Sequence, residues 1–331
     1  MRCYKQRFQR PGRAGVTWFE VVVTILILLL LFTLASKYTV QNAVPAARRA
    51  ECQNKLHQIV MATLNRAQRR NNKLPHLTVE SEIYQSNWFI ELLSDLDKEP
   101  LHRAWVNSQR SGDTFQSPFL REAHCPADSD RFRKPGALSY VANSGFGYFS
   151  VDSESLAVTA TKRHSPIEID WNRDGSVSNL EQSAGLATGV FWPHGTTGDR
   201  TLTLDYITSG DGQSQTIVYT ENKNAGAWTS SHLMDVAFVV GLQRIEFAGG
   251  NTPTDILART NADLGPFAIN GGQTPRRSPG PSSNHNGIVV FTMADGRTRC
   301  VNPRIDQLVY LRLMTPNGRR FGESSQGLKN Y

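Results

Sequence analysis

A single apolar stretch near the start of the chain constrains its organisation more than any other feature. From Val16 to Ser36 there are 21 residues, and only Glu20 among them is charged. At about 1.5 Å per residue, a helix of this length is long enough to cross the hydrocarbon core of a bilayer. The sequence therefore predicts a transmembrane helix over residues 16–36, followed by one large exported part.

The basic residues before this stretch predict its orientation. Five of them precede Gly15 with no acid among them, and they are Arg2, Lys5, Arg7, Arg10 and Arg13. Positive charge beside a span stays in the cytoplasm, so we expect a single-pass protein of the inner membrane with its C-terminal domain periplasmic or extracellular. Without these five, 31 basic residues (36 − 5) face 29 acidic ones, so most of the +7 net charge lies in the leader. The charge therefore favours no nucleic-acid partner.

The candidate processing point lies before the apolar stretch, whereas a simple secretory signal is cut after it. Gly15 directly precedes Val16, and Glu20 lies five residues beyond the glycine. A carboxylate entering lipid costs a few kcal/mol unless it is paired. A free α-amino group at Val16 of a neighbouring subunit would supply that partner.

This arrangement resembles the N-terminal signal of bacterial type IV prepilins and type II secretion pseudopilins. The resemblance implies that a prepilin peptidase cuts between Gly15 and Val16 and methylates the new terminus. It also gives Glu20 a role in the register between assembled subunits. Val16 departs from the phenylalanine usual there. Residues 1–15 would then be a basic leader, and an uncleaved signal anchor is the alternative.

Helical periodicity continues beyond the apolar stretch and predicts a stem helix over residues 37–72. Pro45 predicts a kink or a restart. Asn71-Asn72 and Pro75 predict the helix end. Apolar residues beyond Pro45 recur every three or four positions and form one stripe, namely Leu56, Ile59, Val60, Leu64 and Ala67.

The stem also resembles that of a large, poorly characterised family of bacterial pseudopilin-like proteins. The matching residues are Arg48, Arg49, Cys52 and Asn54, with looser matches at residues 125–128 and 139–145. That family is recognised near its C-terminus by a histidine, nine residues, then Asp-Gly, here His285, Asp295 and Gly296. The resemblance implies a membrane-anchored protein that assembles with like or unlike subunits of a pseudopilus.

Residues 73–315 have the composition of a globular domain. Short β-branched runs, glycine turns and one leading helix predict a pilin-like α+β fold. In this fold an antiparallel sheet packs on the long N-terminal helix and large loops, such as residues 271–286, are inserted. Residues 316–331 are predicted to be a mobile tail.

The four cysteines, Cys3, Cys52, Cys125 and Cys300, include no C-x-x-C pair. Cys3 would be cytoplasmic or lost with the leader. The other three allow at most one disulfide in an oxidising compartment, and three buried thiols are the alternative. Cys52–Cys125 is one candidate bridge.

A twelve-residue segment from Asp170 to Glu181 matches the D-x-N-x-D-G-x₅-E pattern of a calcium loop. Alternate residues would present oxygens to one ion and a glycine allows the bend, which predicts a Ca²⁺ site. Residues 167–169 look extended, and a helix is predicted from Asn179 to Ala187, so this would be a lone loop. An acidic turn without an ion is the alternative. The candidate ligands are Asp170, Asn172, Asp174, Ser176, Ser178 and Glu181.

The C-terminal motif reads as a β-hairpin. Residues 288–293 form an apolar strand, Asp295-Gly296 suits a tight turn, and residues 298–301 return. About eight extended residues would separate His285 from Asp295 by roughly 26 Å, so the two cannot share one ion. Asp295 is interpreted as a turn residue and His285 as a loop hydrogen-bonder. A short helix capped by Asn302, with Pro303 first, is predicted to follow.

These features predict a structural or assembly component, with prepilin peptidase and the membrane as partners. A membrane-tethered ligand-binding module is the alternative. No nucleophile elbow, HExxH or phosphate loop is found, so no enzymatic activity is predicted.

Overall fold

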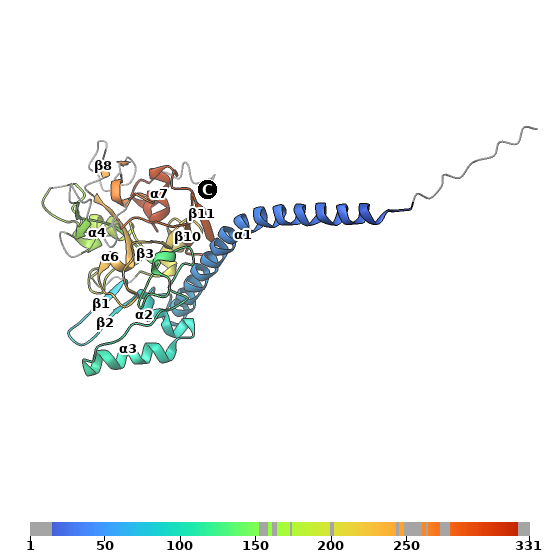
Figure 1. Cartoon of the computed structure of the whole chain (residues 1–331). Coiled ribbons are helices and arrows are strands. Elements are labelled where there is room, and N and C mark those ends of the chain that lie inside the picture. Colours follow the sequence, from blue (N-terminus) through green and yellow to red (C-terminus); the bar gives the residue numbers. More distant parts are fainter. Residues whose placement is uncertain are drawn as a thin grey trace, which may run out of the picture. The chain divides into compact units, whose positions relative to one another are not determined.

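The computed structural model describes residues 15–151, 158–160, 164–172, 174–198, 202–242, 245–247, 260–262, 264–271 and 279–323 (Figure 1). The chain divides into two compact units, with the boundary after Ala47. Residues 1–14 of the expected leader lie outside the described part. Gly15 and Val16 are described, exposed and outside any helix or strand.

Helix α1 (Trp18–Arg69) is 52 residues long and includes Pro45. The predicted restart at Pro45 is therefore wrong, because a proline removes one backbone hydrogen bond and the flanking helix formers keep the turns on either side. Asn71 and Asn72 follow with φ of 55° and 61°, the left-handed conformation that asparagine tolerates. The predicted end of the stem is confirmed.

The described helices include no segment both long and apolar enough to meet the requirement for a membrane span. The span expected at residues 16–36 therefore stays a prediction.

The second unit is built on a mixed five-stranded sheet in the order β11-β10-β6-β3-β7. Its strands are β3 (Tyr140–Gly147), β6 (Ile217–Glu221), β7 (Ala237–Gly241), β10 (Val289–Met293) and β11 (Thr298–Val301). The first four strands in this order pair antiparallel with their neighbours, as expected. The fifth strand, β7, runs parallel to β3. An all-antiparallel sheet is thus wrong, because the long β3–β7 connection allows a crossover.

The two faces of the sheet are covered by different helices. On one face, the Thr63 hydroxyl of α1 lies 2.8 Å from the Tyr219 hydroxyl of β6, and the Trp88 ring centroid lies 4.7 Å from that of Tyr219. On the other, Phe291 of β10 stacks 6.1 Å from Tyr310 of α7 (Gln307–Met314). Phe291 pairs with Thr220, the neighbour of Tyr219, so the two contacts lie on opposite faces.

Shorter elements surround this core. The helices are α2 (Trp88–Leu92), α3 (Glu99–Ser111), α4 (Asn179–Leu186), α5 (Leu204–Ser209) and α6 (Leu233–Val236). Three two-stranded sheets pair β1 (Thr78–Glu80) with β2 (Gln85–Asn87), β4 (Phe149–Val151) with β5 (Val158–Ala160), and β8 (Ile245–Phe247) with β9 (Thr260–Ala262). Single 3₁₀ turns are η1 (Leu93–Leu96), η2 (Ser129–Arg131), η3 (Pro166–Glu168), η5 (Gly265–Phe267) and η6 (Gly318–Phe321).

Three further expectations are corrected. Of residues 167–169, predicted to be extended, Ile167 and Glu168 lie in a 3₁₀ turn, whereas Ile169 is extended. Helix α7 begins later than Asn302-Pro303, because the Asp306 carboxylate accepts hydrogen bonds from the Leu308 and Val309 amides and caps it. The predicted mobile tail is wrong for residues 316–323, where Phe321 is buried. Residues 324–331 lie outside the described part, as do residues 272–278 of the loop at 271–286.

Two buried carboxylates hold residues 315–323 in place. The Asp211 carboxylate accepts hydrogen bonds from the Gly318 amide at 2.6 Å and the Arg319 amide at 3.2 Å. Glu323 accepts one from the Thr315 hydroxyl at 2.6 Å. Burial, with the nearby Asp211 charge, raises the pKa of Glu323 from 4.5 to about 8.

This raised pKa gives stability an unusual pH dependence. Between pH 4.5 and about 8 the unfolded chain loses the Glu323 proton while the folded chain keeps it. The free energy of unfolding should therefore fall as pH rises through this window, by up to about 1.4 kcal/mol per pH unit from this group. Glu323→Gln should flatten that slope in urea titrations at several pH values. An unchanged slope would contradict a buried, protonated Glu323, and the exposed Glu80→Gln is the matched control.

Candidate functional sites

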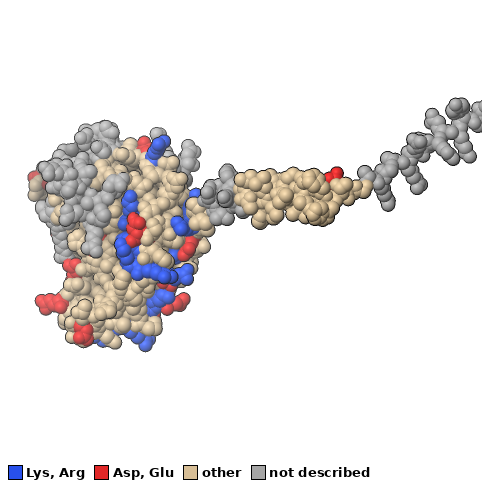
Figure 2. Space-filling view, in the orientation of Figure 1, with Lys and Arg blue, Asp and Glu red and all other residues tan. Residues whose placement is uncertain are grey.

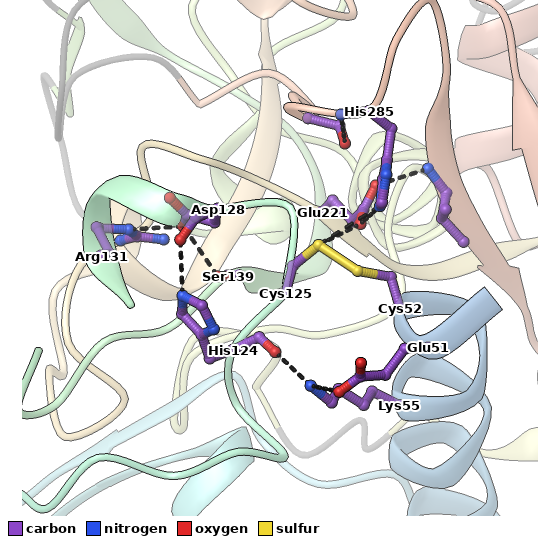
Figure 3. Close-up of a disulfide and its surroundings, with 12 residues drawn as sticks. Glu51, Cys52, Lys55, His124, Cys125, Asp128, Arg131, Ser139, Glu221 and His285 are labelled. Atoms are coloured by element: carbon purple, nitrogen blue, oxygen red, sulfur yellow. Dashed lines mark hydrogen bonds and ion pairs between the residues drawn. A yellow bond between two sulfur atoms is a disulfide. The ribbon is translucent and has the colours of Figure 1, made fainter. Parts of the chain in front are cut away.

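The most concentrated set of reactive side chains lies between α1 and the end of β6 (Figure 3). Cys52 of α1 and Cys125, from the loop between α3 and β3, form a disulfide with Cα atoms 5.4 Å apart. Glu221 is the last residue of β6, and His285 lies in the loop before β10. All four side chains are buried. The candidate bridge named from the sequence is thus present in the structure.

Glu221 and His285 form a buried polar pair directly beside the disulfide. The Nε2 of His285 lies 3.1 Å from the Oε1 of Glu221. The Sγ of Cys125 is 3.1 Å from the same Oε1 and 3.5 Å from His285 Nε2. The other Glu221 oxygen accepts a hydrogen bond from the Val290 amide at 3.0 Å, which ties the carboxylate to β10.

The loop carrying Cys125 is fixed by further polar contacts. The Asp128 carboxylate accepts hydrogen bonds from Arg131 Nε at 2.9 Å and the Ser139 hydroxyl at 3.0 Å. Lys55 of α1 donates to the His124 carbonyl at 3.0 Å. These contacts give a structural reason for the cysteine, aspartate and serine positions that the sequence resemblance singled out.

The two ends of the His285-x₉-Asp295-Gly296 motif have separate environments. Asp295 accepts a hydrogen bond from the Arg297 amide at 3.0 Å, and Gly296 has φ of 88°, so the predicted turn is confirmed. The His57 ring on α1 donates through Nδ1 to the Gly296 carbonyl at 2.8 Å. His285 is a hydrogen-bonding loop residue, as interpreted, but its buried partner Glu221 was missed.

The segment from His285 to Asp295 is not extended along its whole length, contrary to the sequence prediction. Gly287 has φ of 68° and lies in a turn, so the segment from His285 to β10 doubles back. This turn brings His285 over Glu221, whose carboxylate also binds Val290. Asp295 is not part of the resulting cluster.

The two ends of the Asp170–Glu181 loop are joined by hydrogen bonds to the Glu181 carboxylate. Glu181 is buried, and its carboxylate accepts from the amides of Trp171 at 3.0 Å, Asn172 at 3.1 Å and Ser178 at 2.9 Å. Ser178 and Glu181 form a capping box that begins α4, which confirms the predicted helix. Burial raises the pKa of Glu181, but these hydrogen bonds outweigh it and leave the pKa below its usual value.

The other loop ligands bond mainly to one another. Asp174 accepts from the Ser176 amide at 2.8 Å, Asn172 from the Asp174 amide at 2.9 Å, and Asp170 from the Gly175 amide at 2.9 Å. Within the described residues, only the cysteine cluster brings ligand atoms of three or more His, Cys, Asp or Glu side chains within 4.8 Å of one another. Calcium binding would therefore require Glu181 to exchange backbone amides for the ion, and the site stays a prediction.

At the N-terminus, Glu20 accepts a hydrogen bond from the Thr17 amide at 2.9 Å and caps the first turn of α1. Gly15 has no neighbouring heavy atoms in the space where a Cβ would lie.

Residues 41–308 match the model of the family described as "Protein of unknown function (DUF1559)". The match covers most of the chain, which therefore belongs to this family. No curated protein and no solved structure matches the chain.

The disulfide should contribute strongly to stability. It closes a segment with a sequence separation of 73. Loop-closure entropy for a segment of that size corresponds to about 4 kcal/mol. We expect Cys52→Ser/Cys125→Ser to lose about that much in denaturant unfolding, and Cys300→Ser to change it by under about 0.5 kcal/mol. Free thiols at both positions in non-reducing peptide maps would contradict the bridge.

Calcium should stabilise the fold if the Asp170 loop binds it. With a dissociation constant on the order of 10⁻⁴ M, about 10 mM calcium should add roughly 2.7 kcal/mol and raise the Tm. Asp174→Asn should abolish this shift, and it retains a side-chain oxygen for the Ser176 amide, so it is a gentler change than one at Glu181. No calcium-dependent Tm change in the unmodified chain would count against the site, with magnesium as the ion control.

Proposed function

We propose that this DUF1559-family chain is a membrane-anchored, pilin-like structural component. In this proposal a prepilin peptidase cuts after Gly15, α1 holds the chain in the inner membrane, and the unit from Arg48 onward lies on the periplasmic or extracellular side. The proposal rests on the apolar surface of the first half of α1.

That surface is large and extends around the helix. Figure 2 displays it as a stretch almost free of charged side chains. The exposed large apolar residues there are Val16, Trp18, Phe19, Val21, Ile25, Leu26, Ile27, Leu28, Leu29, Leu30, Leu31, Phe32 and Leu34. A helix that is apolar all round requires lipid or other helices around it. Burying each such side chain contributes roughly 1.5–3 kcal/mol, so the driving force for covering this surface is large.

Glu20 supports assembly over simple anchoring. It is the one acid in the exposed apolar part of α1, and the described hydrogen bond to its carboxylate comes from the Thr17 amide in the same turn. A carboxylate in lipid strongly favours a positive partner. The α-amino group created at Val16 by processing would provide one on a neighbouring subunit.

The rest of the fold is compatible with a subunit of this kind. The C-terminal half of α1 packs on a sheet through Thr63 and Tyr219, as a pilin-like arrangement requires.

A ligand-binding module is the second candidate, because one surface hollow favours it. The hollow has a volume of about 670 Å³ and lies beside β11 and α7. Its lining combines two guanidinium groups with apolar side chains, and comprises Arg299, Cys300, Val301, Asn302, Arg304, Ile305 and Leu313. Such a mixture suits an anionic ligand with an apolar part.

The test compares Glu20→Ala with Glu80→Ala, which changes an exposed acid on β1. Both variants and the unmodified chain are expressed with a prepilin peptidase, and their N-termini are read by mass spectrometry. We expect all three to begin at Val16. Chemical crosslinking in membranes should give multimers for the unmodified chain and for Glu80→Ala, and a loss of multimers for Glu20→Ala.

The outcomes separate the hypotheses. An intact Met1 terminus in the unmodified chain would exclude processing and therefore the pilin-like proposal. Processing at Gly15 with crosslinking unaffected by Glu20→Ala would instead favour a tethered, unassembled binding module.

A further inference from the structure

Two ionisable side chains, Glu221 and His285, are buried beside the disulfide, although a structural disulfide needs neither. The Sγ atoms of Cys52 and Cys125, a carboxylate oxygen of Glu221 and a ring nitrogen of His285 all lie within 4.8 Å of one another. A disulfide sulfur carries no proton and gains little from a carboxylate 3.1 Å away. Burying an acid and an imidazole nevertheless carries a large desolvation cost. This cost needs a reason that the disulfide alone does not give.

We infer that Cys52 and Cys125, in their dithiol form, bind one zinc ion together with Glu221 and His285. Two thiolates, one imidazole nitrogen and one carboxylate oxygen are four ligands of the types that zinc takes in tetrahedral sites. Three negative ligands against the +2 ion leave a net charge of −1. The metal would thus compensate most of the buried charge of the two thiolates and the Glu221 carboxylate.

The surroundings orient two of the ligands as zinc sites require. The second oxygen of Glu221 is held by the Val290 amide at 3.0 Å, which leaves Oε1 facing the cysteines. The His285 backbone amide donates to the Ser283 hydroxyl at 3.0 Å and fixes the loop that presents the ring. Such outer contacts position ligands before the metal arrives.

The chemistry balances in two steps. A phosphine reductant and one water convert the disulfide to two thiols, because the phosphine takes the water oxygen and its two protons pass to the sulfurs. Zinc then displaces both thiol protons to solvent and binds the thiolates. Reoxidation by an electron acceptor such as a small-molecule disulfide releases the ion and restores the S–S bond.

The disulfide form and the zinc-bound dithiol form would both link α1 to the segments packed against it. Cys52 belongs to α1, whereas the other three ligands come from the loop before β3, the end of β6 and the loop before β10. In the oxidised chain a covalent bond ties α1 to this region. In the reduced chain a zinc ion would keep the same segments together.

The experiment measures zinc binding by the full chain in detergent, before and after reduction with a water-soluble phosphine. Cys3→Ser and Cys300→Ser remove the two other thiols. We expect one zinc per reduced chain and none per oxidised chain. Cobalt(II) should give the thiolate charge-transfer and intense visible bands of a tetrahedral site, and zinc should protect Cys52 and Cys125 from alkylation.

Two ligand variants test the remaining donors. His285→Ala and Glu221→Gln should each weaken zinc binding about tenfold or more, while His102→Ala on α3 should leave it unchanged. The redox comparison on the unmodified ligand set does not depend on whether these variants fold. Absence of zinc uptake by the reduced chain would overturn the inference, as would equal uptake by the oxidised chain. Full affinity in folded His285→Ala and Glu221→Gln would show that the thiols act alone and would also overturn it.

Discussion

The covalent link between Cys52 and Cys125 is the contact on which the arrangement of α1 and the sheet depends most. The other contacts of this helix half with its surroundings are single hydrogen bonds, ion pairs and apolar packing, such as Thr63 with Tyr219 and Lys55 with the His124 carbonyl. Each hydrogen bond contributes about 1 kcal/mol and each buried apolar side chain roughly 1.5–3 kcal/mol, whereas the bridge alone contributes about 4 kcal/mol.

The polar groups buried beside this link are compensated by one another and by a backbone amide. Glu221 ends β6, and its carboxylate bonds at once to His285 and to the Val290 amide of β10. The carboxylate therefore connects β6 with its neighbour β10 and with the loop before β10 that carries His285. Removing either Glu221 or His285 would leave the other side chain buried without a partner. The free-energy cost of such an unpaired group exceeds that of burying the pair.

Much of the fold could be predicted from local sequence. The apolar stripe on α1, the Asp295-Gly296 turn and the helix that begins at Asn179 each have a local sequence signal, and each was predicted. Ser178 and Glu181 were assigned to a calcium loop, so their capping box at the start of that helix was missed. The parallel β7 and the role of Glu221 could not be predicted in this way. Their partners lie far along the chain, and a glutamate that ends an apolar strand has no local mark that distinguishes burial from exposure. The packing of Phe321 was missed for the same reason.

The spacing of the His285-x₉-Asp295-Gly296 motif follows from how the hairpin is fastened to α1. At one end, the Gly287 turn folds His285 back onto the cluster that contains Cys52. At the other, the Gly296 carbonyl accepts a hydrogen bond from His57 at 2.8 Å, five residues further along the same helix. The nine residues between contain β10 and the turn that leads into it, so a deletion within them would detach one of the two ends. The motif is therefore best understood as two attachment points on one helix, and the distance between them is set by the strand that joins them.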